Sequence, residues 1–270
     1  MAKDARNRDA GVRHTGTPDA RHLDVKICGI TTADALDAAL DAGADLVGFV
    51  HFPKSPRHLT LAEAPGLVAR VEGRARKVAL LVDPDDALLA QVVAAFSPDL
   101  LQLHGHETPE RVAAIRAAFG LPVMKALPVG RREDLAPLPA YAAVADLILF
   151  DAKPDPGALL PGGNGRPFDW RLVAGLDAGR PLMLSGGLTV DNVSQALSEV
   201  RMDGVDVSSG VEDAPGVKSP DKIRAFVAAV RRVEARLPEG HLPDQPAEAE
   251  PTRATTAPGP EDLSSKVRAS

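Results

Sequence analysis

The sequence predicts an α/β protein built as one (β/α)8, or TIM, barrel. Eight short apolar runs alternate with Ala- and Leu-rich segments whose apolar residues recur at helical spacing, as in a parallel sheet with helices between its strands. The runs are continuously apolar, which is typical of strands buried on both faces. Because eight such runs lie within residues 23–235, a closed barrel is favoured over an open doubly wound sheet.

The predicted strands share an apolar centre, and they span residues 25–30, 45–52, 77–82, 100–105, 121–127, 146–152, 181–187 and 205–210. A helix is expected to follow each strand. Thr32 precedes ADALDAAL and Asp83-Pro84 precedes DDALLAQVVAAF, which places helix-start signals after the first and third strands.

The longest connection, residues 153–167, is rich in Gly and Pro. On the catalytic face of a barrel such a loop is typical of a lid, the alternative being a floppy insertion. Phe168-Asp169-Trp170 is expected to open the next helix, with Trp170 as a packing anchor rather than a ligand.

Both ends of the chain differ from the barrel segment. Residues 1–22 carry charge and almost no large apolar side chain, and residues 236–270 hold six Pro and no aromatic residue. Neither segment buries enough surface to offset the entropy of ordering it, so the sequence predicts disordered tails around a single catalytic domain at 23–235.

Composition excludes several classes of function. A net charge of −6 with 3% aromatic residues argues against binding nucleic acid. No run approaches 18 apolar residues and no apolar segment resembles a secretory signal, so no membrane association and a cytoplasmic location are expected. The single cysteine fits a reducing compartment and excludes a multi-cysteine zinc site. A monomer and a homodimer remain equally open.

In a barrel of this kind, chemistry belongs at the carboxyl ends of the strands. The predicted strands place ten polar side chains there, namely Cys28, His51, Asp83, Gln102, His104, Lys125, Asp151, Ser185, Asp206 and Ser208. Among them His51 and His104 are candidates for substrate contacts. Neither histidine lies in a metal-ligand motif, so no metal is expected.

Cys28 is a candidate general base or nucleophile, and Asp151 is a candidate general acid. A lone cysteine in an apolar strand is usually a small buried hydrophobe. As a base it needs to be a thiolate, which nearby positive charge favours, and Lys26 shares its face of the strand. An aspartate at the edge of an apolar barrel is suited to a general acid, whereas the alternative is a loop cap or a pair with Lys153.

Two glycine- and serine-rich loops predict a phosphate site. Gly186-Gly187 end the seventh strand and Ser208-Ser209-Gly210 end the eighth, which is the usual phosphate position in such barrels. The alternative is a pair of tight turns. Arg57, after the second strand, presents a planar fork that suits a carboxylate or phosphate, although a solvated loop arginine is commoner.

Seven segments together resemble a known family. These are VKICGIT (25–31), DLVGFVHFPKSPR (45–57), LQLHG (101–105), LFDAK (149–153), GGNGRPFDW (162–170), LSGGLTVDNV (184–193) and GVDVSSGVEDAPGVKSPDKI (204–223). In this order they resemble phosphoribosylanthranilate isomerases of tryptophan biosynthesis, a (β/α)8 family, over 24–230. Asn164 and Pro167 depart from the residues common in relatives.

The resemblance implies a cofactor-free Amadori rearrangement of a phosphosugar, N-(5-phosphoribosyl)anthranilate. It implies that Cys28 is the general base and Asp151 the general acid. It also assigns Arg57 to the anthranilate part and places Asp206 near the substrate. The phosphate would be held by Gly186, Gly187, Ser208, Ser209 and Gly210.

Three alternatives remain. An indole-glycerol-phosphate synthase would need a catalytic lysine, for which Lys125 is the candidate. A histidine-pathway isomerase would need paired aspartates on the first and fifth strands, where this chain has Cys28 and LPVMKAL. A non-catalytic phosphometabolite binder would keep the phosphate loops and lose the acid–base pair.

Overall fold

The computed structural model describes residues 22–155, 162 and 167–236. Of the predicted tails at 1–22 and 236–270 only residues 22 and 236 are described, and of the predicted lid at 153–167 only residues 153–155, 162 and 167; the rest of these segments lies outside the described residues. Over the described part of the chain, no helix is both long and apolar enough to cross a membrane.

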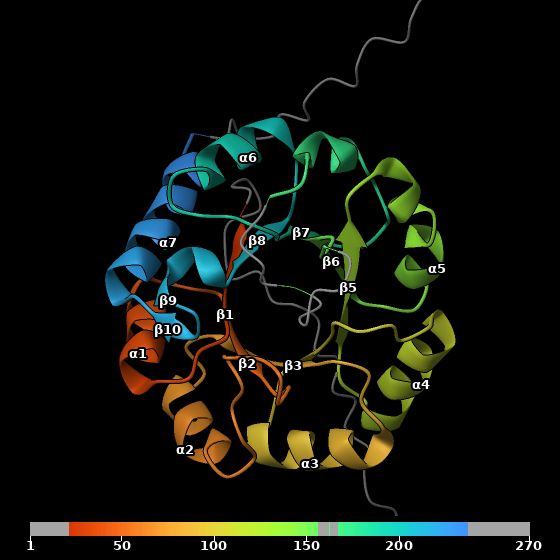
Figure 1. Cartoon of the computed structure of the whole chain (residues 1–270), viewed down its shortest axis with the longest axis vertical. Helices are drawn as coiled ribbons and strands as arrows, with labels where there is room; N and C mark the ends of the chain where they lie inside the picture. Colours follow the sequence, from red (N-terminus) through yellow and green to blue (C-terminus); the bar gives the residue numbers. More distant parts are fainter. Residues whose placement is uncertain (1–21, 156–161, 163–166, 237–270) are drawn as a thin grey trace, which may run out of the picture.

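Eight parallel strands close into a barrel, which confirms the predicted fold (Figure 1). They pair in sequence order, and the last strand pairs with the first. The strands are β1 (Asp24–Cys28), β2 (Leu46–Val50), β3 (Arg76–Leu81), β4 (Leu100–Leu103), β5 (Val123–Val129), β6 (Leu147–Ala152), β7 (Leu182–Leu184) and β8 (Gly204–Val207). Nearly every residue in them is buried, as continuously apolar strands require.

The outer layer holds seven α-helices and four 3-10 helices in the described residues. The α-helices are α1 (Ala33–Asp41), α2 (Ala64–Val68), α3 (Asp86–Phe96), α4 (Pro109–Phe119), α5 (Leu138–Ala142), α6 (Val193–Glu199) and α7 (Pro220–Glu234). The 3-10 helices are η1 (Ala69–Val71), η2 (Arg132–Leu135), η3 (Trp170–Val173) and η4 (Ser209–Val211). A short hairpin, β9 (Glu212–Ala214) and β10 (Val217–Lys218), precedes α7.

Two of the predicted helix positions need correction. Thr32 caps α1 as predicted, but α3 begins at Asp86, one residue into the predicted segment DDALLAQVVAAF, because Asp85 is the cap and accepts from the N–H of Leu88. Asp83 instead has a left-handed backbone with φ of 48°. After β6 the described segment forms the 3-10 helix η3 rather than an α-helix, and Trp170 is buried in it as predicted.

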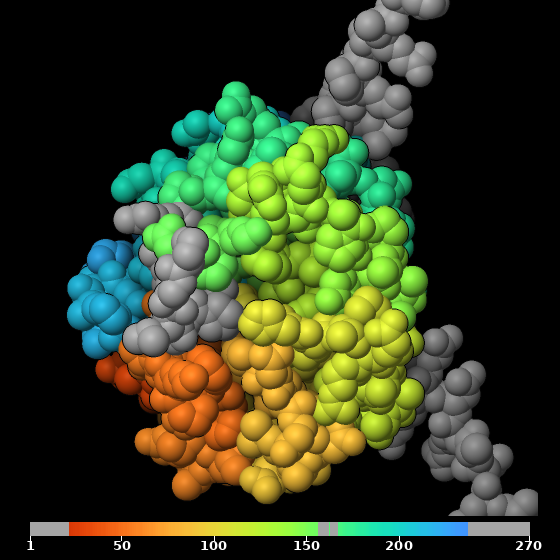
Figure 2. All heavy atoms as spheres, turned by 45° about the vertical axis from the view of Figure 1, so that its right-hand side comes forward, coloured from red at the N-terminus to blue at the C-terminus, as the bar shows by residue number. Residues whose placement is uncertain are grey.

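The described residues form three separate apolar clusters. The largest fills the space between the strands and the helices, the second fills the barrel with side chains such as Leu46, Met124 and Met183, and a small third cluster includes Val50 and Leu80. Helix α7 lies beside α1, so the last helix closes the ring next to the first (Figure 1). In the space-filling view, segments from orange to green follow one another around the body in sequence order (Figure 2).

Candidate active site

A pocket opens at the carboxyl ends of the barrel strands. Its polar lining includes Cys28, Arg57, His104, Asp151, Ser185, Asp206, Ser208 and Ser209. Its apolar lining includes Val50, Phe52, Leu80, Val82 and Leu188. Most of the predicted site residues therefore share one cavity, at the end of the barrel where the fold predicted chemistry.

Cys28 lies at this mouth beside a buried ion pair. Lys26 precedes Cys28 by two residues on the same face of β1, and its Nζ lies 2.9 Å from Oδ1 of Asp206 on β8. Gly48 faces both groups, since a Cβ there would lie 3.0 Å from Sγ of Cys28 and 3.1 Å from Nζ of Lys26. A side chain larger than hydrogen at position 48 would thus press on the thiol and on the ammonium group.

The charges around Cys28 act in opposite directions. Burial raises the pKa of the Cys28 thiol, and Asp206 adds to this, whereas the Lys26 ammonium lowers it; the net effect is a raised pKa. Burial works against the charge of Lys26, but Asp206 and Cys28 together outweigh it and raise the pKa of Lys26. Near neutral pH these shifts favour a neutral thiol next to a charged lysine.

Asp151 ends β6 and contacts a histidine rather than the lysine considered from the sequence. Its Oδ2 lies 3.1 Å from Nε2 of His104, and its Oδ1 accepts from the N–H of Ala152 at 2.9 Å. Lys153 instead pairs with Asp134. The backbone of Gly162 packs against both Asp151 and His104, so a Cβ at Gly162 would collide with them.

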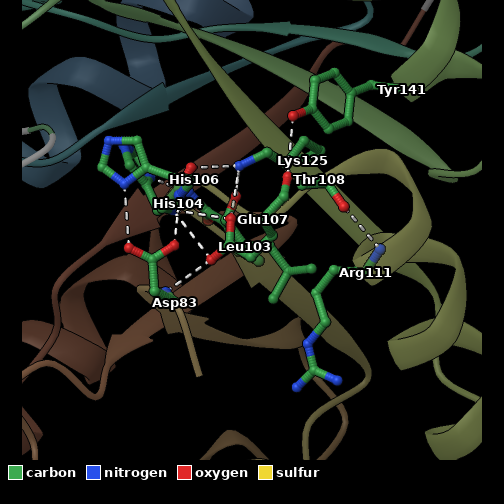
Figure 3. Close-up of polar contacts among 11 residues, drawn as sticks. Asp83, Leu103, His104, His106, Glu107, Thr108, Arg111, Lys125 and Tyr141 are labelled. Carbon is green, nitrogen blue, oxygen red and sulfur yellow. Dashed lines mark hydrogen bonds and ion pairs between the residues drawn. The ribbon is translucent and has the colours of Figure 1, made fainter. Parts of the chain in front are cut away.

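The loop after β4 is held by a second buried ion pair (Figure 3). Glu107 and Lys125 are joined at 2.7 Å, and each side chain is 2% exposed. The carboxylate of Glu107 accepts from the N–H of Gly105, and Lys125 Nζ donates to the Gly105 carbonyl at 2.7 Å. The N–H and the carbonyl group of Gly105, the residue after His104, are thereby both hydrogen-bonded.

Arg57 is 6% exposed and belongs to a three-membered charge cluster. It donates from Nε and Nη2 to both carboxylate oxygens of Glu212, at 2.7 and 2.9 Å. Lys218 lies 2.6 Å from the same carboxylate and 3.0 Å from the carbonyl oxygen of Ser208. The structure thus excludes a solvated loop arginine and leaves one more cation than anion in this cluster.

Burial and pairing shift the charges of the cluster. Burial opposes the charge of Glu212, but Arg57 and Lys218 outweigh it and lower the pKa of Glu212. Burial also lowers the pKa of Lys218, and the carboxylate of Glu212 only partly offsets this. Glu212 is therefore held as an anion between two cations at the pocket wall.

The predicted phosphate loops lie side by side at the mouth. Gly186, Gly187, Ser208 and Ser209 line the pocket, and the two glycines have φ of 81° and 66°. Gly210 does not line it, because its backbone packs against the carbonyl of Leu188 with no room for a Cβ. Its contribution is the close approach of the two loops.

Three of the ten strand-end residues point away from the pocket. His51 contacts the carbonyl of Leu59 through Nδ1, and its ring lies 4.8 Å from the ring of His58 in a tilted arrangement. Asp83 binds the backbone and ring of His106. Lys125 alternates with Met124 and Ala126, which fill the barrel, so it faces the helices.

Some of the site is not evident from single motifs. Glu212 and Lys218 lie in the segment GVEDAPGVK, where charged residues usually form a solvated turn. The sequence also does not predict the apolar wall of the pocket, formed by Val50, Phe52, Leu80 and Val82, because apolar residues of this kind are typical of a strand core. Only the register of the closed barrel brings them to the mouth.

The one group of potential metal ligands that the described residues bring together lies at the opposite end of the barrel. His22, Asp24 and Asp45 offer ligand atoms within 4.8 Å of one another. Arg231 already lies 2.6 Å from Asp45 there. These residues precede or begin β1 and β2, so the group is remote from the pocket.

Comparisons with known proteins agree with this geometry. A family model described as N-(5'phosphoribosyl)anthranilate (PRA) isomerase matches residues 25–229. The N-(5'-phosphoribosyl)anthranilate isomerase of Azorhizobium caulinodans is 72% identical over 213 residues, covering 79% of this chain and 93% of that protein.

Solved structures give the same result. The phosphoribosyl anthranilate isomerase of Thermotoga maritima has a TM-score of 0.70 at 34% identity, covering 78% of this chain and 99% of its own. A phosphoribosyl anthranilate isomerase in complex with reduced 1-(o-carboxyphenylamino)-1-deoxyribulose 5-phosphate has a TM-score of 0.66 at 32% identity, with the same coverage.

Proposed function

The chain belongs to the family of N-(5'-phosphoribosyl)anthranilate isomerases of tryptophan biosynthesis, and on that premise we propose that Cys28 is its general base and Asp151 its general acid. The proposed reaction is the Amadori rearrangement of N-(5-phosphoribosyl)anthranilate to 1-(2-carboxyphenylamino)-1-deoxyribulose 5-phosphate. One observation carries the proposal: Cys28 and Asp151 lie three strands apart around a closed barrel and line the same pocket.

The first step needs an acid. A proton from the Asp151 carboxyl group goes to the ring oxygen of the furanose, the bond from C1′ to that oxygen breaks, and the nitrogen lone pair forms a cationic iminium. The hydrogen bond from His104 then stabilises the carboxylate that is left. A positioned acid of this kind contributes about 10²–10⁴ in rate.

The second step needs a base. The iminium acidifies the C2′–H, and Cys28 as a thiolate removes that proton to give an enolamine, which tautomerises to the ketone. Because burial favours the neutral thiol, the arriving positive charge of the iminium and the charge of Lys26 are what favour the thiolate. The chemistry requires no cofactor and no metal.

Substrate binding is proposed at two ends of the pocket. The phosphate would bind at Gly186, Gly187, Ser208 and Ser209, with Gly210 shaping the loop. The carboxylate of anthranilate would meet Arg57, and its ring would rest on the apolar wall near Phe52. Asp206 and His104 would contact the ribose between them. Two anchored ends hold the sugar between acid and base.

The alternative that requires a catalytic lysine has less support. Lys125 is the residue it needs, and its ammonium group is tied to Glu107 outside the barrel. A non-catalytic binder also has less support, since both Cys28 and Asp151 line the cavity. A thiol that must remain reduced fits the expected cytoplasmic location.

Two variants test the proposal. Cys28→Ser and Asp151→Asn are each expected to lower kcat by at least about 10²-fold while circular dichroism and thermal unfolding stay near those of the parent. The assay follows the fluorescence of phosphoribosylanthranilate as it is consumed. Asp86→Asn, an exposed aspartate of α3 that does not line the pocket, is the matched control for the change of charge and should keep its kcat. Near-normal turnover by either active-site variant would refute the assignment of that residue.

A further inference from the structure

Gln102 is a fully buried amide whose place in the barrel calls for an explanation. It lies in β4 between Leu80 of β3 and Met124 of β5, which are both apolar and buried. Within the described part of the chain, its Oε1 has no hydrogen-bond partner. A buried amide that is only partly satisfied destabilises a fold relative to an apolar side chain of similar size. Packing therefore gives no reason for a glutamine here.

The hydrogen bond that Gln102 does make is to His104. Its Nε2 lies 3.1 Å from Nδ1 of the imidazole. An amide nitrogen only donates, so Nδ1 must accept and must carry no proton. In a neutral imidazole the proton is then on Nε2, which donates to Oδ2 of Asp151 at 3.1 Å.

This tautomer matters to the acid. The Asp151 carboxyl group accepts from His104 at Oδ2 and from the N–H of Ala152 at Oδ1, so its acidic proton must occupy one of the remaining lone pairs. In the other tautomer Nε2 would itself be an acceptor. It would then take the hydrogen bond of the Asp151 proton, which the reaction has to deliver to the sugar.

The backbone around His104 is held in place, so the tautomer of its imidazole ring depends on the group that contacts Nδ1, which is Gln102. The backbone of His104 is fixed by its N–H bond to Leu81, and the next residue is clamped by Glu107 and Lys125 (Figure 3). We propose that Gln102 is a positioning residue that holds His104 in its Nε2–H tautomer, so that His104 donates to Asp151. This inference rests on the proposed role of Asp151 as the acid.

The tautomer is measured directly in the full-length protein labelled with ¹⁵N-histidine. Long-range ¹⁵N–¹H correlation spectra at neutral pH distinguish a bare ring nitrogen from a protonated one, and the His104→Asn variant identifies the His104 signals. We expect a bare Nδ1 and a protonated Nε2. A protonated Nδ1 in the parent protein would overturn the proposal, whatever the behaviour of any variant.

The Gln102→Met variant separates positioning from structure. Met keeps the length of the side chain and removes the amide, so we expect unchanged or higher thermal stability, a mixed tautomer signal, and kcat lower by about tenfold, the factor that corresponds to one ordinary hydrogen bond. KM should change by less than about twofold, because Gln102 does not line the pocket. An unchanged ring spectrum with unchanged kcat, or a loss of activity that only follows a loss of folded protein, would refute the inference.

The neighbouring Met124→Leu variant is the control. It alters the same layer of the barrel by a volume-conserving change and should leave both kcat and the His104 spectrum unchanged. Failure of the underlying mechanism is recognised separately. It would appear as near-normal turnover by Asp151→Asn, whereas the tautomer of His104 is read without any turnover.

Discussion

Gly48→Ala is expected to impair both the stability and the chemistry of the barrel, because the added methyl group has no free space. Gly48 pairs with Cys28 in the register of β1 and β2. A Cβ at this position would lie 3.0 Å from Sγ of Cys28, 3.1 Å from its Cα, and 3.1 Å from Nζ of Lys26. Non-bonded carbon contacts are most favourable at about 3.5–4.0 Å, so the neighbouring atoms have to move by a few tenths of an ångström.

The sign of the effect follows from which atoms can move. The Sγ atom and the Lys26 ammonium can shift, but the Cα of Cys28 belongs to a strand that is hydrogen-bonded on both sides. Overpacking of a closed interior costs about 1–3 kcal/mol. We therefore expect the free energy of unfolding to fall by about that amount. Displacement of the thiol should lower kcat/KM by at least about tenfold.

The measurement combines urea unfolding with steady-state kinetics on the same preparations. Gly66→Ala is the matched control. Gly66 lies in α2, a Cβ there would meet nothing within 4 Å, and its backbone is helical. That variant should gain about 0.4–1 kcal/mol and keep its kinetics. A Gly48→Ala protein as stable and as active as the parent would show that a methyl group at position 48 does not press on the thiol of Cys28 or on the ammonium group of Lys26.

Two further predictions concern charge. Glu212→Gln should lower stability by about 1–3 kcal/mol near neutral pH and raise KM, because Arg57 loses its charged partner. The pKa of Glu212 is lowered in the folded protein, so the stability that its carboxylate contributes is present above pH 4.5 and is lost as the pH falls. The difference in the free energy of unfolding between variant and parent should therefore shrink in acid. Urea titrations at several pH values measure this difference, and a constant difference would contradict the prediction. The pKa of His22 is raised from 6.5, since Asp45 outweighs burial. The His22→Asn variant should therefore lose less than about 1 kcal/mol of stability below pH 6.5 and should lose none in alkali. Thermal unfolding that differs more in alkali than in acid would exclude it.

The fold was largely predictable because its signal is repeated. Each of the eight strands is an apolar run, and a run missed by a residue or two does not change the topology. The helix after β6 was not predictable in the same way. Its segment, Trp170–Val173, is followed by Ala174 in an extended conformation and by Gly175 with φ of 69°, which end it after one turn. Local backbone geometry of this kind is weakly encoded in periodicity.

The site was predictable in its members but not in its geometry. Position at a strand end selected Cys28, Asp151 and Asp206, which line the pocket, yet it also selected Lys125, which faces the helices. Which face a residue takes depends on parity along the strand, and a strand buried on both faces gives no polar alternation from which to read that parity. The partners of the predicted residues were hidden for another reason. Glu212 reaches Arg57 across 155 residues of sequence, a contact that only the closed barrel creates.

The arrangement of charge explains why a barrel interior holds a lysine at all. A buried ion pair such as Lys26–Asp206 is usually no more stabilising than an apolar pair of the same volume. Lys26 lies two residues before Cys28 on the same face of β1, which gives the pair a second effect. Its ammonium group lowers the pKa of the Cys28 thiol, whereas burial raises that pKa. The balance still favours the thiol. In the proposed mechanism the thiolate, which is the form that reacts with oxidants, would arise when the cationic iminium lies above it, and the only cysteine of the chain would be protected from oxidation between turnovers.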